Sequence, residues 1–463
     1  MIAPTEIGWR LGKATGPFGP DLWVPFDRTA GVIGPQGSGK TLDLLVPALL
    51  DAPGAAIVTL TKPEDLFLTA EYRSRDGRPI VVLDPFVLAP GFPELVWDPI
   101  AGCDDSMLAE RRAKAFTAGS IKGSVSGDQA ARFYAGEAAK VLQAYFHAAA
   151  LEGLGLEEVL QWVADPLQHS LPEEILRTNP RAAPLWDGLL RGALHGDDRT
   201  AGNTITTIQQ TLALFFQGSI RRRCVPSAGR PATDIEDVIA RGGTIYLLGR
   251  DDPYTSASPL MTAVAEHVLD AALRLATTSD HGRLCPPFLA CLDELPSTTP
   301  LPTLRTRMAN ERALGLSFIW ASQTFTQLKV CYGEDEAHSI LGLSNNLVVF
   351  GGGKDIEFYR QLSDLVGSTR VTRESAQKHG PSFSRSWQGE EVPILRPEEI
   401  RRLPEKSALV ISGHSAPIVA KLRRCLDGKR GQQLKADQEI ARARSRKASA
   451  DHTAYDLDTT GEL

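Results

Sequence analysis

A glycine-rich octapeptide near the start of the chain combines residue types that can surround a chain of phosphates. Residues 34–41 read Gly-Pro-Gln-Gly-Ser-Gly-Lys-Thr, which fits the pattern G-x-x-x-x-G-K-[ST]. The apolar run 30–33 predicts a strand before this loop, and the run from Leu42 predicts a helix after it. A glycine-rich turn that matched by accident would lack this context, so the sequence predicts a nucleotide-binding P-loop.

Each part of the P-loop has its own chemical task. Gly34 and Gly39 let the backbone curl so that its N–H groups face phosphate, and the helix N-terminus adds its dipole. Lys40 can reach the β- and γ-phosphates, and the hydroxyl of Thr41 can hold Mg²⁺. We therefore expect ATP and Mg²⁺ as cofactors. The expected nucleotide-binding residues are Gly34, Pro35, Gln36, Gly37, Ser38, Gly39, Lys40, Thr41 and Leu42.

Two acids and an amide follow apolar runs further along the chain. Asp293 and Glu294 come directly after the apolar run 288–292, and Gln323 ends another such run. ATP hydrolysis needs an acid that organises the metal and a group that activates water. We expect Asp293 to share Mg²⁺ with Thr41, Glu294 to polarise the attacking water and Gln323 to sense the γ-phosphate. The alternative is that these are ordinary polar residues at strand ends.

Positive charge for the transition state must come from arginine. Arg28 lies upstream of the P-loop, and Arg312 lies downstream of the two acids. Either could reach a nucleotide held by the next subunit of a ring, as an arginine finger. Arg305 and Arg307 compete for this role, and each of the four could instead be a solvated surface residue.

The composition limits the class of protein. A chain of 463 residues with 42% hydrophobic residues suits two or three domains with a real core. Its net charge of −6 excludes a protein that coats nucleic acid by charge alone. The 6 cysteines show no C-x-x-C spacing, which favours reduced thiols over zinc or disulfides. No signal peptide and no apolar run on the order of 18 residues is present, so we expect a chain that folds in water.

Strand and helix patterns predict an α/β fold with a discontinuous nucleotide-binding domain. Residues 1–30 form a lead-in, and residues 31–102 and 225–427 alternate apolar strand runs with helical stretches, which is typical of a parallel sheet. Between them, residues 103–224 show helical periodicity alone and predict an all-α insertion. Residues 428–463 are charged and poor in aromatics, so we expect a disordered tail.

A series of motifs resembles the type IV secretion coupling proteins, the conjugative DNA-transfer ATPases, and fits their actinobacterial branch best. The resemblance runs from about residue 22 to residue 425. The P-loop and Leu-Asp-Glu are shared by many ATPases, whereas the series after them is much more specific. The motifs are Leu60–Asp65, Val82–Pro85, Trp97–Pro99, Gly242–Tyr246, Leu292–Leu295, Pro300–Pro302, Gln323, Tyr332-Gly333 and Gly351-Gly352.

The resemblance implies a RecA-like P-loop motor with a mostly parallel central sheet, interrupted by an all-α domain that recognises substrate. It implies a homo-hexameric ring at the cytoplasmic face of the cell membrane. Such a ring recruits a DNA–relaxase complex or protein effectors to a type IV secretion channel and drives DNA through it by ATP hydrolysis. Carried over by position, Lys40 and Thr41 bind phosphate and Mg²⁺, and Asp293 and Glu294 form the Walker B pair. Gln323 is the sensor, and Arg28 and Arg312 match arginines near the subunit boundary.

One departure from the family concerns membrane attachment. Family members usually carry transmembrane helices before the motor, whereas the P-loop here begins at residue 34. We expect either a piece of a longer protein or a natural form that docks on a separate membrane partner, and a monomer where the anchor is missing.

Two basic segments are candidate DNA contacts. The polar segment 369–391 is expected to be a long loop, and Arg221-Arg222-Arg223 closes the helical insertion. The basic residues of the polar segment, with its tryptophan, are Arg370, Arg373, Lys378, Arg385 and Trp387.

Two other functions stay open. A recruitment platform would use nucleotide to control assembly with little turnover. A chromosome-segregation-type double-stranded-DNA translocase would share the motor, but that group usually lacks a large helical insertion.

Overall fold

A single mixed sheet organises the protein. The computed structural model describes residues 7–16, 18–121, 129–249, 256–379 and 382–459. Within these residues, 11 strands form one sheet in the order β2-β1-β13-β12-β9-β3-β8-β7-β4-β6-β5. The parallel strands are β3 (Ala30–Ile33), β4 (Ala56–Leu60), β5 (Ile80–Leu83), β6 (Thr244–Leu248), β7 (Phe288–Leu292), β8 (Leu316–Ser322) and β9 (Asn346–Phe350). The antiparallel strands at one side are β1 (Gly8–Ala14), β2 (Asp21–Pro25), β12 (Ser407–Ser412) and β13 (Ile418–Lys421). The expected α/β class with a mostly parallel sheet is confirmed.

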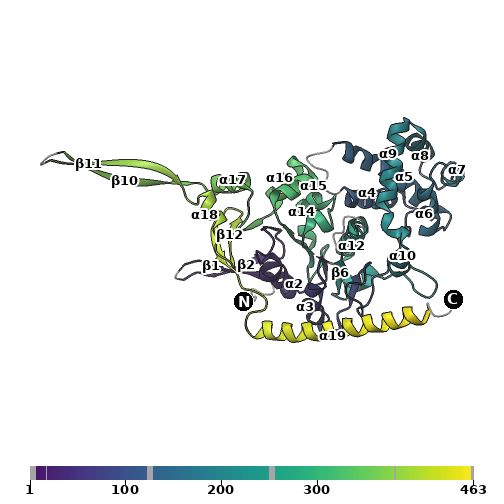
Figure 1. Ribbon diagram of the computed structural model, residues 1–463, viewed down its shortest axis with the longest axis horizontal. Helices are drawn as coiled ribbons and strands as arrows, with labels where there is room; N and C mark the ends of the chain where they lie inside the picture. The colour runs from purple at the N-terminus through teal and green to yellow at the C-terminus, as the bar shows by residue number, and fades with distance from the viewer. Residues whose placement is uncertain (1–6, 17, 122–128, 250–255, 380–381, 460–463) are drawn as a thin grey trace.

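Helices cover both faces of the parallel strands, which explains why these strands are apolar along their whole length. Alternate residues of β4 enter opposite layers, because Ile57 joins one buried apolar cluster and Val58 joins the other. The layer on the Val58 side holds η1 (Lys40–Leu45), α2 (Val46–Asp51) and α3 (Pro63–Arg73). The short η2 (Arg75–Gly77) follows α3 and buries no residue. The layer on the Ile57 side holds α11 (Ile235–Ala240), α12 (Ser258–Thr278), α13 (Leu295–Thr298), α14 (Leu304–Asn310), η4 (Arg312–Leu314), α15 (Phe325–Tyr332), α16 (Glu334–Leu343), α17 (Ile356–Val366) and α18 (Pro397–Arg401). Figure 1 shows the two layers above and below the sheet.

The chain leaves the sheet after β5 and returns to it at β6, and these two strands are hydrogen-bonded neighbours. The described residues between them include a helical body, seen at the right of Figure 1. Its helices are α4 (Ser106–Ser120), α5 (Gln129–Leu151), α6 (Leu156–Ala164), α7 (Leu171–Thr178), α8 (Trp186–His195), α9 (Asp198–Thr211), η3 (Ala213–Phe216) and α10 (Gly218–Cys224). Phe116 of α4 and Phe146 of α5 belong to the same buried cluster as Val264 of α12. The helical body therefore packs directly on the layer that covers the sheet.

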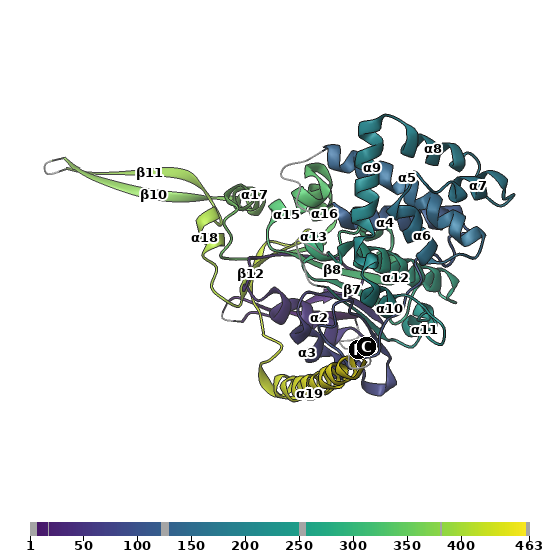
Figure 2. The ribbon, with the colours of Figure 1, turned by 45° about the vertical axis from the view of Figure 1, so that its right-hand side comes forward.

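The C-terminal segment is helical, so the expectation of a disordered tail over 428–463 is wrong for its described residues. Helix α19 (Gly428–Thr459) lies along the outside of α3 in both views (Figures 1 and 2). It buries Leu434 and Ala441 against the body. Its charged residues find partners on α3 and η2, which the composition of the segment alone does not reveal. These ion pairs are Arg75 with Asp437, Arg442 with Glu64 and Arg444 with Glu71.

The polar segment 369–391 is a β-hairpin, so the expectation of a loop is also wrong. Strands β10 (Ser368–His379) and β11 (Ser382–Pro393) pair along their whole length, from Ser368 with Pro393 to His379 with Ser382. The hairpin extends away from the sheet in Figures 1 and 2. The hairpin could not be predicted from the residue pattern, because neither face of its strands carries the apolar stripe that marks a half-buried strand.

Candidate nucleotide-binding site

The expected site residues meet at one edge of the sheet. Strands β3, β8, β7 and β4 are adjacent and parallel, so their carboxyl ends lie side by side. The P-loop follows β3, Gln323 follows β8, Asp293 follows β7, and Lys62 lies just beyond β4. In open parallel sheets this edge is where ligands bind.

The backbone of the P-loop depends on its glycines. Gly37 and Gly39 have φ angles of 77° and 102°, in the left-handed region that favours glycine. A Cβ at Gly34 would lie 2.8 Å from the Cβ of Phe350, so the loop also needs a glycine where it passes β9. The hydroxyl of Ser38 is buried and has no hydrogen-bond partner among the described residues, which leaves it available to a phosphate oxygen.

Lys40 lies folded against its own loop. Its side chain is 5% exposed, and Nζ donates hydrogen bonds to the carbonyl oxygens of Gly34 at 2.6 Å and Pro35 at 3.2 Å. Nζ also lies 3.8 Å from Oε1 of Glu294. Burial lowers the pKa of Lys40, while the charges of Glu294 and Asp293 oppose that shift. The ammonium group is thus held at the mouth of the loop by weak acceptors that a phosphate can replace.

Asp293 connects the P-loop to the central strands. Its Oδ2 accepts a hydrogen bond of 2.6 Å from the hydroxyl of Thr41, and its Oδ1 accepts one of 3.0 Å from the backbone N–H of Glu294. Burial raises the pKa of Asp293, and the bond from Thr41 and the charge of Lys40 act in the opposite direction. A hydroxyl beside a carboxylate offers the oxygen ligands that Mg²⁺ prefers. The described residues contain no cluster of three or more His, Cys, Asp or Glu side chains that could hold a metal ion.

Glu294 and Gln323 form a second pair beside the first. Nε2 of Gln323 donates a hydrogen bond of 3.1 Å to Oε2 of Glu294. Glu294 has a φ of 49°, an unusual value for a residue other than glycine, and backbone strain of this kind is frequent at functional sites. Burial raises the pKa of Glu294, while the charge of Lys40 lowers it. The arrangement brings Lys40, Thr41, Asp293, Glu294 and Gln323 together, as the sequence predicted.

The candidate arginines lie at the other edge of the sheet. Arg28 lies just before β3, with Thr29 between them, and Arg312 precedes the start of β8. Nη1 of Arg312 donates to Oδ1 of Asn345 at 3.1 Å, and the same oxygen accepts from the N–H of Thr29 at 3.1 Å. Neither arginine can therefore serve the P-loop of its own chain, because the whole length of the strands separates them.

The two competing arginines are engaged elsewhere. Arg307 is buried and pairs with Glu266, Asp270 and Glu311. Arg305 is partly exposed and pairs with Glu336 at 2.9 Å. An arginine surrounded by three carboxylates is bound within its own subunit, which argues against Arg307 as a finger.

Three residues near the site escaped prediction as site residues. The hydroxyl of Thr59 donates to the backbone oxygen of Asp293 at 3.0 Å, which ties β4 to the end of β7. Asp65 lies in the first turn of α3, where burial and then the charge of Asp293 raise its pKa to about 6. Asp43, in η1, is fully buried and pairs with Arg424. The motif 60–65 contained the signal for Asp65, since it carries charge directly after a buried strand.

One further finding concerns membranes. No helix in the part of the chain that the structure describes is both long and apolar enough to cross a bilayer.

Comparisons with known proteins agree with this site and fold. Residues 5–146 match the family described as type IV secretory system conjugative DNA transfer. Residues 287–405 match the family described as the TraM recognition site of TraD and TraG. The two matches contain the P-loop, the two acids and Gln323.

Relatives and solved structures extend this agreement over most of the chain. The conjugal transfer protein TraG of Agrobacterium fabrum is 24% identical over 399 residues, covering 83% of this chain and 58% of TraG. The protein VirD4 of Rhizobium rhizogenes is 23% identical, covering 89% of this chain and 61% of VirD4. This chain thus spans about 60% of the length of these relatives.

The fold is that of a solved coupling protein. The bacterial conjugative coupling protein TrwBdeltaN70 superposes with a TM-score of 0.64 at 20% identity, covering 87% of this chain and 86% of that one. Plasmid coupling protein TrwB in complex with ADP and Mg²⁺ superposes with a TM-score of 0.61 at 19% identity, covering 86% of each chain. This chain therefore belongs to the family of type IV secretion coupling proteins, on the evidence of the two family matches, the relatives and the shared fold.

Proposed function

We propose that this protein is an ATPase that couples DNA, with its relaxase, or a protein effector to a type IV secretion channel and drives translocation through it. The observation that carries the proposal is the cluster at the carboxyl edge, in which Thr41 contacts Asp293 while Lys40 and Gln323 flank Glu294. TrwB, a coupling protein of the same fold, binds ADP and Mg²⁺, which supports these cofactors here.

The residues present suit ATP and Mg²⁺. Bound Mg²⁺ would supply charge that neutralises the β- and γ-phosphates. Thr41 and Asp293 would hold the metal, and the N–H groups of the loop 34–42 would face the phosphates. Lys40 would exchange the carbonyl oxygens of Gly34 and Pro35 for phosphate oxygens.

Glu294 is the group placed to activate water. Its raised pKa keeps it a better base than a solvated glutamate, and the bond from Gln323 fixes the direction of its carboxylate. Loss of that bond when Gln323 turns to the γ-phosphate would link the state of the nucleotide to β8. Gln323 therefore acts as a sensor in this proposal.

The position of the arginines supports a ring of copies. Arg28 and Arg312 lie at the edge opposite to their own P-loop, so they can complete a site only in a neighbouring copy. We propose a homo-hexamer at the cytoplasmic face of the membrane. Without a membrane anchor, the hexamer is expected to dissociate into monomers.

The helical insertion is the proposed substrate-recognition domain, and the hairpin β10–β11 is the better candidate for DNA contact. Arg370 on the hairpin is exposed, and the side chains of Arg373, Lys378 and Arg385 lie outside the described residues. In the arginine run that ends α10, by contrast, Arg221 pairs with Glu157 and Arg223 with Glu94. Such pairing leaves that run less able to hold phosphates.

ATPase activity with and without DNA tests the proposal. We expect DNA to raise turnover several-fold, as in a motor that works on DNA. Negligible turnover in both conditions, together with tight effector binding, would favour the recruitment platform instead.

A further inference from the structure

Arg424, which is far from the P-loop in sequence, binds the helix that follows the P-loop. Asp43 lies in η1, and its side chain is 0% exposed. Nε of Arg424 donates to Oδ1 of Asp43 at 2.9 Å, and Nη2 donates to Oδ2 at 3.4 Å. This two-point contact fixes the orientation of the carboxylate as well as its charge.

The carboxylate of Asp43 fills the space beside Gly39. A Cβ built on Gly39 would lie 2.2 Å from Oδ2 of Asp43 and 3.6 Å from Nη2 of Arg424. The N–H of Asp43 also donates to the carbonyl oxygen of Gly39 at 2.7 Å. The turn that presents the backbone donors of the P-loop therefore rests directly on the Asp43–Arg424 pair.

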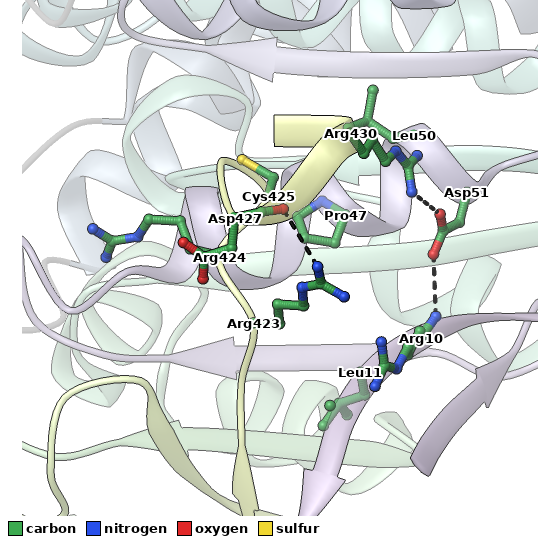
Figure 3. Close-up of a pocket in the computed structure, with 11 residues that line it drawn as sticks. Arg10, Leu11, Pro47, Leu50, Asp51, Arg423, Arg424, Cys425, Asp427 and Arg430 are labelled. Carbon is green, nitrogen blue, oxygen red and sulfur yellow. Dashed lines mark hydrogen bonds and ion pairs between the residues drawn. The ribbon is translucent and has the colours of Figure 1, made fainter. Parts of the chain in front are cut away.

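A backbone contact accompanies the ion pair. The N–H of Cys425 donates to the carbonyl oxygen of Leu42 at 2.9 Å. Further on, Arg430 pairs with Asp51 at the end of α2. Between these contacts a cavity of about 140 Å³ separates the segment from β1 and α2. Figure 3 shows Arg424 extending away from this cavity, whereas Arg10 and Arg430 lie on its far side around Asp51.

A buried carboxylate without its cation is strongly unfavourable. If Arg424 were removed, the carboxylate of Asp43 would lose both hydrogen bonds that fix its orientation. Its turning away would alter the group against which Gly39 is packed. The position of the P-loop turn is therefore sensitive to a residue that no nucleotide needs to touch.

We propose that Arg424 is a positioning residue for the phosphate site, acting through Asp43 on the Gly39 turn. The segment Leu422–Asp427, which leads into α19, thereby forms part of the nucleotide site. The effect on nucleotide binding rests on the function proposed above, whereas the effect on the turn does not.

Hydrogen exchange and nucleotide affinity test this assignment together. In Arg424→Ala we expect faster amide exchange over residues 37–43 in the absence of nucleotide, and a Kd for ADP with Mg²⁺ at least about tenfold higher. Arg424→Lys keeps the charge and is expected to remain within about threefold of the wild type. In an Asp43→Asn background, where no buried charge needs a partner, adding Arg424→Ala should change the Kd by less than about twofold.

Arg423→Ala is the matched control, because Arg423 neighbours Arg424 in sequence but donates to the backbone oxygen of Asp427, whereas Arg424 donates to Asp43. The amide exchange of Arg423→Ala over residues 37–43 and its Kd for ADP with Mg²⁺ should equal those of the wild type. Unchanged exchange over 37–43 in Arg424→Ala overturns the assignment, as does an equal loss in Arg423→Ala. A wild type that binds no nucleotide would overturn the proposed ATPase, while the exchange experiment would still decide the role of Arg424.

Discussion

The hydroxyl of Thr41 donates a hydrogen bond of 2.6 Å to Asp293, although 252 positions of sequence separate the two residues. Strand β8 lies between β3 and β7, so the bond closes the edge of the sheet across an intervening strand. The two oxygens form a ready pair of ligands for a hard cation.

Removal of the Thr41 hydroxyl should weaken the contribution of the metal to nucleotide binding. We expect Thr41→Ala to raise the Kd for ADP about tenfold in Mg²⁺ but to have little effect in EDTA, because the lost oxygen acts through the metal. Thr41→Ser keeps the hydroxyl and should bind like the wild type. Titration calorimetry in the two buffers measures the difference, and equal losses in both would contradict the metal role.

Substitutions of Lys40 and Glu294 should affect nucleotide binding and ATP hydrolysis differently. We expect Lys40→Ala to lose both, since its ammonium group faces the phosphates. Glu294→Gln should bind ATP normally and turn it over about 10²–10³-fold more slowly, because the amide cannot accept the proton from water. Equilibrium binding and a phosphate-release assay distinguish the two. Normal hydrolysis by both variants would show that the site is misplaced.

Arg312 should act on the site of a neighbour. Arg312→Ala is expected to bind nucleotide normally and to lose turnover on the order of 10³-fold. Mixed with Lys40→Ala, which keeps Arg312 but has no working P-loop, it should recover activity above the sum of the separate variants. A mixture of Lys40→Ala with Asp293→Asn serves as control, since both changes disable the same site. Absence of recovery in the first mixture would place Arg312 outside the site.

Asp65 should make stability depend on pH. Burial raises its folded pKa to about 6 from an ordinary value of 3.8, so the folded state holds the proton more tightly than the unfolded state. Its contribution favours folding below about pH 4 and is lost as pH rises through about 6. We expect Asp65→Asn to be more stable than the wild type by about 1–2 kcal/mol at pH 7.5, with the gain vanishing toward pH 4.

Urea denaturation at the two pH values measures this gain. Glu64→Gln, in the same turn of α3, is the control, because Glu64 is exposed and pairs with Arg442. It should show no stabilisation at pH 7.5. Equal stability of Asp65→Asn and the wild type at pH 7.5 would mean that the carboxyl is better solvated than its surroundings indicate.

The sequence was sufficient to predict the parallel sheet and the residues at its carboxyl edge. Lys40, Asp293 and Gln323 each follow an apolar strand, and parallel order alone brings such positions together. Helix α19 was missed because its own sequence is mostly charged, and its docking uses two buried apolar residues, Leu434 and Ala441, with charged partners on α3. The link between Asp43 and Arg424 joins positions 381 apart and follows from the tertiary path of the C-terminal segment. No local pattern encodes a contact of this kind.

The hairpin β10–β11 was missed for a different reason. Its two strands pair through the backbone in one continuous register, from Ser368 with Pro393 to His379 with Ser382. Residues of low hydrophobicity can therefore occupy both strands, and the segment reads as a loop.

The chain enters the helical body after β5 and leaves it before β6, and these two strands are neighbours in the sheet. A different helical body could occupy the same excursion without altering the order of any other strand, provided that its first helix kept the surface that α4 shares with α12. If the helical body recognises the substrate, as proposed, then replacing this one contiguous stretch would change the substrate and leave the residues of the nucleotide-binding site in place.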